Sequence, residues 1–272
     1  MPTTLSADTA LSLIEGNLRA FWRLSGTFPG FTLREHPGSF SVTSGLPFPL
    51  FNVVLPHAGP VAAEPHQLEV VLDQMRQAGA PFLFWTLPSS PPGLSELLIQ
   101  QGLNHVGTAT GMVIDLTRPL KTLAPPAEVV RVLDDALVQA YLQVLSGAFG
   151  LPERFMDFTT RWMESFGIRP DSDTPSVVAF MDGQPVGCAT MSFGAGTAGI
   201  YNVGVLEPAR RRGVGALMTR ELLALAVQRG VQTAILHSTP MGLNMYTSLG
   251  FEPHGDVGQY LWLPDPAGMP DH

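Results

Sequence analysis

The chain has 272 residues, of which 45% are hydrophobic, and its formal net charge is −8. This length and composition allow one large or two ordinary domains with a buried core, and they exclude a largely disordered chain. The acidic balance argues against non-specific nucleic-acid binding, which depends on Lys and Arg at phosphates, and it weakly favours a cationic substrate.

A single cysteine, Cys188, excludes an internal disulfide framework and a zinc site built from cysteines. It lies in an apolar run, so we expect a small buried residue rather than a nucleophile. The histidines of the first half lack metal-ligand spacing, and no metal is expected. The N-terminus does not resemble a signal peptide, and no window reaches the ~20 apolar residues that span a bilayer. We expect a cytoplasmic protein with no membrane partner.

Hydrophobic spacing in the first half predicts alternating helices and strands. A helix over 5–24, with Ser6 as its cap, precedes strands near 31–34, 39–43 and 50–55. A helix over 64–78, a strand over 81–87, a short helix over 94–101 and a strand over 106–116 follow. The next segment, 117–127, carries Pro119, Pro125 and Pro126 and is predicted to be a linker.

The second half begins with a strand over 128–132 and a helix over 134–149. A further helix begins after Pro152 and continues to about residue 166. Asp182-Gly183 is a strong two-residue turn signal, and it predicts a hairpin of strands 176–181 and 185–193. The remaining elements are a strand over 199–205, a helix over 213–229, a strand over 233–237, a helix over 242–249 and a strand over 258–263.

The two halves resemble each other at a period of about 150 residues, which indicates an internal repeat. Phe51-Asn52-Val53 corresponds to Tyr201-Asn202-Val203, and Gln101-Gly102-Leu103 corresponds to Leu249-Gly250-Phe251. The order strand, helix, strand, short helix, strand also occurs twice. We therefore expect two α/β domains, each with a mixed, largely antiparallel sheet and helices on both faces. The predicted ranges are 1–117, a linker at 118–127, 128–264 and a tail at 265–272.

The most informative segment joins a strand to a long helix and contains Arg210, Arg211, Arg212, Gly213 and Gly215. The first turn of a helix offers unpaired N–H groups and a positive dipole end, and glycines allow a ligand to approach the main chain. Arginines add charge-assisted hydrogen bonds. A pyrophosphate suits this junction. The Walker pattern is missing, and the glycine spacing does not match that of a dinucleotide fold.

The pattern Arg210-x-x-Gly213-x-Gly215, after the strand Val203-x-Val205-x-x-Pro208, resembles the Arg/Gln-x-x-Gly-x-Gly/Ala signature of Gcn5-related N-acetyltransferases (GNAT). The resemblance covers roughly residues 130–264. It implies an acetyl-CoA donor whose pyrophosphate lies on the loop amides and whose acyl-pantetheine arm lies beside the preceding strand. The implied cofactor-binding residues are Val203, Gly204, Val205, Arg210, Arg211, Arg212, Gly213, Val214, Gly215, Ala216 and Ser238.

The resemblance also implies a catalytic residue. Tyr246 matches the position at which many family members carry a tyrosine near the coenzyme A sulfur, where it returns a proton to the thiolate. The first repeat has an apolar residue there, Leu98. A glutamate found on the phosphate-loop strand of some members is missing, so the general base stays open among Glu153, Asp157, Glu164, His237 and water.

The first half lacks the arginines and glycines of the loop. Pro56 and Pro60 remove N–H donors from the place where a pyrophosphate would need them. We therefore interpret residues 1–117 as a degenerate GNAT-like domain without cofactor, which either covers a sheet edge or walls the acceptor pocket.

The leading hypothesis is an N-acetyltransferase that acts on a primary amine of a small molecule or peptide. An alternative is a non-catalytic acyl-CoA sensor, which the missing strand carboxylate supports, and a third is an interaction scaffold with a vestigial loop. Monomer and homodimer both remain open.

Overall fold

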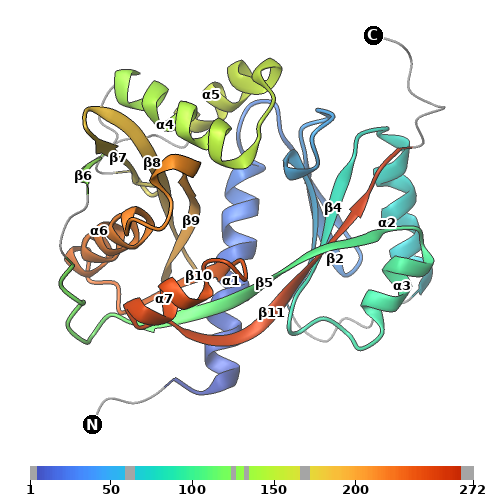
Figure 1. Cartoon of the computed structure of the whole chain (residues 1–272). Coiled ribbons are helices and arrows are strands. Elements are labelled where there is room, and N and C mark those ends of the chain that lie inside the picture. The colour runs from blue at the N-terminus through green and yellow to red at the C-terminus, as the bar shows by residue number, and fades with distance from the viewer. Residues whose placement is uncertain (1–4, 59–64, 124–126, 132–134, 166–171, 265–272) are drawn as a thin grey trace. The chain divides into compact units, whose positions relative to one another are not determined.

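The computed structural model describes residues 5–58, 65–123, 127–131, 135–165 and 172–264 (Figure 1). The first half contains α1 (Ala7–Ser25), β1 (Thr32–His36), β2 (Ser39–Thr43), η1 (Pro49–Phe51), β3 (Asn52–Pro56), α2 (Pro65–Gln77), β4 (Phe82–Thr86), α3 (Leu94–Gln100) and β5 (Asn104–Asp115). The second half contains β6 (Glu128–Arg131), α4 (Asp135–Phe149), η2 (Glu153–Phe155), α5 (Met156–Ser165), β7 (Ser176–Met181), β8 (Gln184–Gly194), β9 (Thr197–Val205), η3 (Glu207–Ala209), α6 (Val214–Gln228), β10 (Thr233–Ser238), α7 (Leu243–Leu249) and β11 (Glu252–Trp262).

The predicted helices and strands are confirmed in type and order, and most boundaries agree within two residues. The Ser6 cap is present, because its hydroxyl oxygen accepts the N–H of Thr9 at 3.2 Å. Asp182 and Gly183 have φ of 52° and 74°, the left-handed conformation that a tight hairpin turn requires. The largest difference is β11, which begins six residues before the predicted strand 258–263. Of the predicted linker, 124–126 lies outside the described residues.

The chain forms two compact units whose segments alternate along the sequence. The C-terminal unit consists of the described residues within Met1–Asn17 and Gly111–His254. The N-terminal unit consists of those within Leu18–Thr110 and Gly255–His272. These units differ from the consecutive ranges 1–117 and 128–264, because α1, β5 and β11 each contribute residues to both.

In the C-terminal unit, β6, β7, β8 and β9 pair antiparallel in sequence order, and β10 pairs parallel to β9. The end of β5 lies on the other side of β10. Helix α6 packs its apolar face on these strands, and its buried residues Met218, Leu222 and Leu223 join the main core. The opposite face is covered by α4 and by the start of α1, whose Ala10 and Ile14 contact Ile235.

In the N-terminal unit, β1, β2 and β3 pair antiparallel, and β4 pairs parallel to β3. Helices α2 and α3 bury apolar residues such as Leu72 and Leu98 against the sheet. This unit therefore repeats the arrangement of β8, β9, α6, β10 and α7 in the C-terminal unit, as the internal similarity predicted.

Each half of the sequence ends in a strand, β5 in the first half and β11 in the second. Each of these two final strands pairs with a strand of the other half. The strand beside β4 is the end of β11, with Gly258 opposite Thr86 and Trp262 opposite Phe82. The strand beside β10 is β5 from the first half, and the N–H of Leu116 continues this contact by donating to the carbonyl of Gln232 at 2.8 Å. The internal similarity predicts the order of the elements, but it does not indicate which strands β5 and β11 pair with. Their exchange was therefore not predicted.

Candidate functional site

The strand-to-helix junction after β9 is built by one 3-10 turn and two left-handed residues. The turn η3 begins with Glu207-Pro208, where proline suits the first turn, and buries Ala209. Arg211 then adopts φ of 62° and Gly213 adopts φ of 82° as the N-cap of α6. These reversals bring consecutive peptide N–H groups to the start of the helix.

Six consecutive N–H groups at this junction have no hydrogen-bond partner within the described residues, namely those of Arg211, Arg212, Gly213, Val214, Gly215 and Ala216. The flanking groups are paired: Arg210 donates to the carbonyl of Glu207, and Leu217 donates to the carbonyl of Gly213. Unpaired N–H groups at the positive end of a 15-residue helix attract an anion, so this junction is the candidate anion site. A diphosphate has enough oxygens to accept hydrogen bonds from most of these N–H groups.

The three arginines lie exposed around this anion site. Arg210 uses its Nε to donate to the carbonyl of Val205 at 3.1 Å, which ties the loop to the end of β9. Its terminal nitrogens and the side chains of Arg211 and Arg212 make no hydrogen bond or ion pair among the described residues. The loop therefore carries positive charge available to a ligand.

The two glycines of the motif have different local roles. Gly213 supplies the left-handed N-cap, where a side chain costs free energy. Gly215 is buried, and a Cβ there would lie 3.2 Å from the sulfur of Met245. Gly215 therefore allows α6 to begin close to α7.

Strand β9 carries a β-bulge just before this junction. Thr190 of β8 faces Tyr201 and Cys188 faces Gly204, so Asn202 and Val203 together oppose one residue of β8. Asn202 adopts φ of 54°, a conformation that asparagine tolerates better than most residues. The sequence comparison had singled out Asn202, but only as a repeat identity.

Strands β9 and β10 separate at the bulge. Their parallel pairing covers Ala234 to Leu236, opposite Ala198 to Ile200. Beyond Tyr201, β9 continues to Val205 and β10 continues to Ser238, with no further register partners between the two strands in the part of the chain that the structure describes. The backbone edge of β9 from Asn202 to Val205 therefore has no strand partner from β10 among the described residues, and it leads directly to the six N–H groups. An extended ligand with amide groups and a diphosphate end fits this sequence of donors and acceptors.

Tyr246 lies on α7 and packs in the core of the C-terminal unit. Its ring meets Phe251 edge-to-face at 5.9 Å, and burial raises the pKa of its hydroxyl to about 12. The phenol is therefore protonated at neutral pH, a state in which it can donate a hydrogen bond but cannot act as a base. The hydroxyl has no hydrogen-bond partner among the described residues.

The proposed correspondence between Tyr246 and Leu98 agrees with the helix ends. The N–H of Phe251 donates to the carbonyl of Tyr246 at 3.1 Å, and the N–H of Leu103 donates to that of Leu98 at 3.0 Å. A left-handed glycine precedes the donor in both turns. The first half therefore has an apolar side chain where the second half has a phenol.

Ser238, predicted as a contact of the pantetheine arm, is buried at the end of β10. Its hydroxyl donates to the carbonyl of Thr239 at 2.8 Å, so only its acceptor lone pairs remain for another group. Val203 and Val205 place their side chains against the core, and a Cβ on Gly204 would lie 2.9 Å from Ala148. These strand residues therefore offer a ligand mainly their backbone groups.

Among the residues considered as a base, Glu153, Asp157 and Glu164 are exposed. His237 differs, because both its ring nitrogens are buried without a hydrogen-bond partner in the described part of the chain, and its ring stacks at 6.3 Å on Tyr201. Burial lowers the pKa of His237 to about 4, so its imidazole is neutral at pH 7. Cys188 is buried as expected, and burial raises the pKa of its thiol to about 12.

The buried His237 predicts an acid-sensitive fold. The unfolded chain binds a proton at this imidazole below its usual pKa of 6.5, whereas the folded chain does so only near 4. The stabilisation that comes from keeping His237 neutral is therefore fully present above pH 6.5. The free energy of unfolding decreases as the pH falls from 6.5 to 4. Urea denaturation at pH 7 and pH 5 measures how much the free energy of unfolding decreases between these two pH values. This decrease should be about 2 kcal/mol smaller in His237→Phe than in the wild-type protein. An equal decrease in the variant and in the wild-type protein would contradict the assignment of the acid sensitivity to His237.

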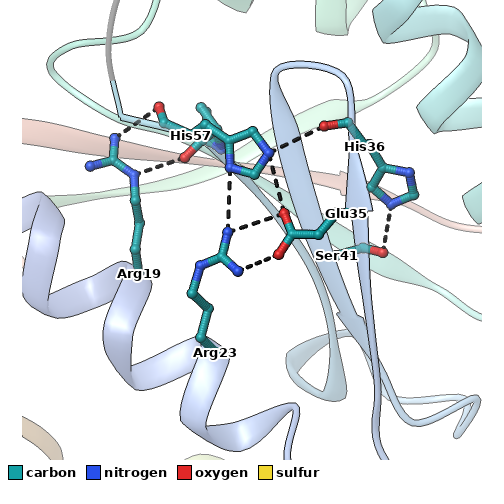
Figure 2. Close-up of polar contacts among 7 residues, drawn as sticks. Arg19, Arg23, Glu35, His36, Ser41 and His57 are labelled. Carbon is teal, nitrogen blue, oxygen red and sulfur yellow. Dashed lines mark hydrogen bonds and ion pairs between the residues drawn. The ribbon is translucent and has the colours of Figure 1, made fainter.

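In the N-terminal unit, the corresponding turn follows β3, and Arg19 contacts its first described residues (Figure 2). Arg19 donates from Nε to the carbonyl of Pro56 at 2.8 Å and from Nη2 to that of His57 at 3.2 Å. The N–H of His57 donates to the carbonyl of Gly38. Among the described residues of this turn, the N–H of His57 and the carbonyls of Pro56 and His57 are therefore already bonded within the protein.

Charged side chains interact beside this turn, and the strand that precedes it has no β-bulge. Arg23 pairs with Glu35, whose other oxygen lies 3.4 Å from His57 Nε2 (Figure 2). The hydrogen bond from Arg23 lowers the pKa of the Glu35 carboxyl. Strand β3 pairs with β2 without interruption, and Asn52 is extended with φ of −138°, unlike Asn202. These differences support the interpretation of the first half as a domain without cofactor, which stays a prediction.

The described residues contain no cluster of three or more His, Cys, Asp or Glu side chains able to hold a metal ion. Among the helices of the described segments, none is long and apolar enough to cross a bilayer.

Solved structures show which fold the chain has. A GCN5-related N-acetyltransferase from Kribbella flavida matches with a TM-score of 0.67 and 18% identity over 98% of this chain and 97% of that chain. One from Sphaerobacter thermophilus matches with a TM-score of 0.63 and 17% identity over 97% and 95%. A tandem GNAT protein from the clavulanic acid biosynthesis pathway matches with a TM-score of 0.60 and 15% identity over 96% and 98%. The chain therefore has the mixed α/β fold of tandem GNAT proteins.

The second half of the sequence is similar to one family model. Residues 138–251 match the model of the Acetyltransferase (GNAT) family. A search of curated proteins gave no match. The matched residues, which include the bulge, the arginine-glycine loop and Tyr246, are therefore similar to this family.

Proposed function

We propose that the protein is an N-acetyltransferase that transfers the acetyl group of acetyl-CoA to a primary amine of a small molecule or peptide. The observation that carries the proposal is the run of six N–H groups at 211–216 that no described residue accepts, which continues the edge of β9 from Asn202 to Val205. The GNAT family match supports the acyl-CoA class of donor. The net charge of −8 favours a cationic acceptor.

In the reaction the amine forms a bond to the acetyl carbon, the bond from carbon to sulfur breaks, and coenzyme A leaves as a thiolate that takes up, through water, the proton lost by the amine. The six N–H groups and the arginines hold the diphosphate, and backbone groups of Val203 to Val205 bind the arm. A main-chain N–H at the bulge polarises the thioester carbonyl. The Tyr246 phenol donates a hydrogen bond to the departing sulfur. With no carboxylate in β9, water removes the amine proton.

The test is to incubate the protein with acetyl-CoA and a panel of amines while following thiol release, with mass spectrometry of the product. Amine-dependent release is the expected result. Tight binding of coenzyme A without release for any amine would instead favour an acyl-CoA sensor, to which the absence of an acid in β9 points. If calorimetry detects no coenzyme A binding, the remaining hypothesis is an interaction scaffold with a vestigial loop.

A further inference from the structure

Asn17, near the middle of α1, is a buried residue with an unusual number of partners. It is 1% exposed, and every partner lies in the hairpin of β8 and β9, at least 175 positions away in sequence. Its Nδ2 donates to the carbonyl of Gly194 and to Oγ1 of Thr197, both at 3.0 Å. Its Oδ1 accepts the hydroxyl proton of Tyr201 at 2.7 Å. The amide side chain therefore holds both the beginning and the middle of β9.

The fit between α1 and β9 requires a glycine in the strand. A Cβ on Gly199 would lie 2.0 Å from Oδ1 of Asn17, a distance that excludes any side chain at this position. On the helix, a Cβ on Gly16 would lie 3.0 Å from that of Ala195, at the hairpin turn. The close approach of helix and strand is thus built into both sequences.

Tyr201 is the last residue of β9 before the bulge. It pairs with Thr190, whose hydroxyl is itself held by Tyr141 at 2.6 Å and by Ser176 at 2.8 Å. Tyr201 is therefore fixed through its own hydroxyl to α1 and through its pairing partner to α4. The two residues that follow, Asn202 and Val203, carry the backbone that opens toward β10.

We propose that Asn17 is a positioning residue for the transfer reaction, which acts through Tyr201 to hold the bulge at Asn202 and Val203 in register. The inference rests on the proposed function in one respect, since the bulge is the part of β9 that would polarise the thioester. Displacement of a polarising group by a fraction of an ångström slows chemistry while leaving distant binding contacts in place. The N-terminal helix is then a component of the catalytic apparatus.

The decisive variants are Tyr201→Phe, which removes one hydroxyl, and Asn17→Ala, which removes the amide. Each should lower kcat roughly tenfold and leave the KM for acetyl-CoA within about twofold, because the phosphate loop is unchanged. The double variant should be no slower than the slower single variant, since both changes break one link. Asn104→Ala, at an exposed site in β5, should leave kcat unchanged.

A second readout does not depend on activity. Hydrogen exchange followed by mass spectrometry should show faster exchange in the peptide that covers residues 200–205 for both variants, with α6 unaffected. If the wild-type protein transfers no acetyl group, the proposed function fails, but faster exchange would still establish that Asn17 holds the bulge. Wild-type exchange at 200–205, or a loss of activity explained entirely by a lower fraction of folded protein, would overturn the proposal.

Discussion

Gly213→Asp is expected to abolish coenzyme A binding, with a dissociation constant raised on the order of 100-fold or more. The substitution places a carboxylate at the N-cap of α6, beside six N–H groups that attract an anion. The like charge of a diphosphate is repelled, and the added atoms fill the space that glycine leaves open. Titration calorimetry with coenzyme A measures the change directly, and thermal denaturation verifies that the variant is folded.

Two controls separate charge from shape in this experiment. Gly213→Asn adds almost the same atoms without charge, and asparagine tolerates the left-handed φ of 82° at this position. It should weaken binding much less than aspartate does. Ala58→Asp adds a carboxylate to the exposed turn of the first half, where Arg19 already occupies the carbonyls, and should change nothing. Equal affinities of Gly213→Asp and wild-type protein would remove the diphosphate site from this loop.

Tyr246→Phe should lower kcat by roughly 10- to 100-fold while leaving the affinity for coenzyme A within about twofold. The hydroxyl, with its pKa raised to about 12, stays protonated, and its role is to donate a hydrogen bond to the thiolate rather than to transfer the proton fully. The variant keeps the edge-to-face contact with Phe251, so the core of the C-terminal unit is preserved. Steady-state kinetics at saturating acetyl-CoA give the comparison.

The matched control for this variant is Tyr260→Phe, which removes the hydroxyl of another buried tyrosine, in the N-terminal unit. It should leave kcat unchanged. The pH profile provides a further check, because a phenol with so high a pKa produces no alkaline loss of activity below about pH 10. Identical turnover of Tyr246→Phe and wild type would exclude the donor role.

The elements of the fold could be predicted because each carries its own local signal. Gly102 and Gly250 end short helices, Asp182-Gly183 makes a hairpin turn, and Ser6 caps α1, as their residue types indicate. The destination of β11 could not be predicted in this way. Its residues are compatible with either sheet, and the choice depends on contacts that are distant in sequence.

The candidate site was predictable to a similar extent. The loop from Arg210 to Gly215 carries a compact motif whose residues serve local geometry, so the sequence alone marks it as the candidate site. The bulge at Asn202 has a weaker signal, an asparagine within a strand, and becomes evident only from the register of β8 and β9. The contact of Asn17 with Tyr201 joins residues 184 positions apart and leaves no local pattern.

The exchange of closing strands has a consequence for how this chain can be divided. A gene truncated in the proline-containing linker would encode a second half without the strand that covers β10 and without Asn17, and a first half without the strand that covers β4. Each fragment would expose an unpaired, apolar strand edge, which is a common cause of aggregation. The smallest piece that folds and can be assayed is therefore the whole chain, or both fragments produced together so that each supplies the strand missing from the other.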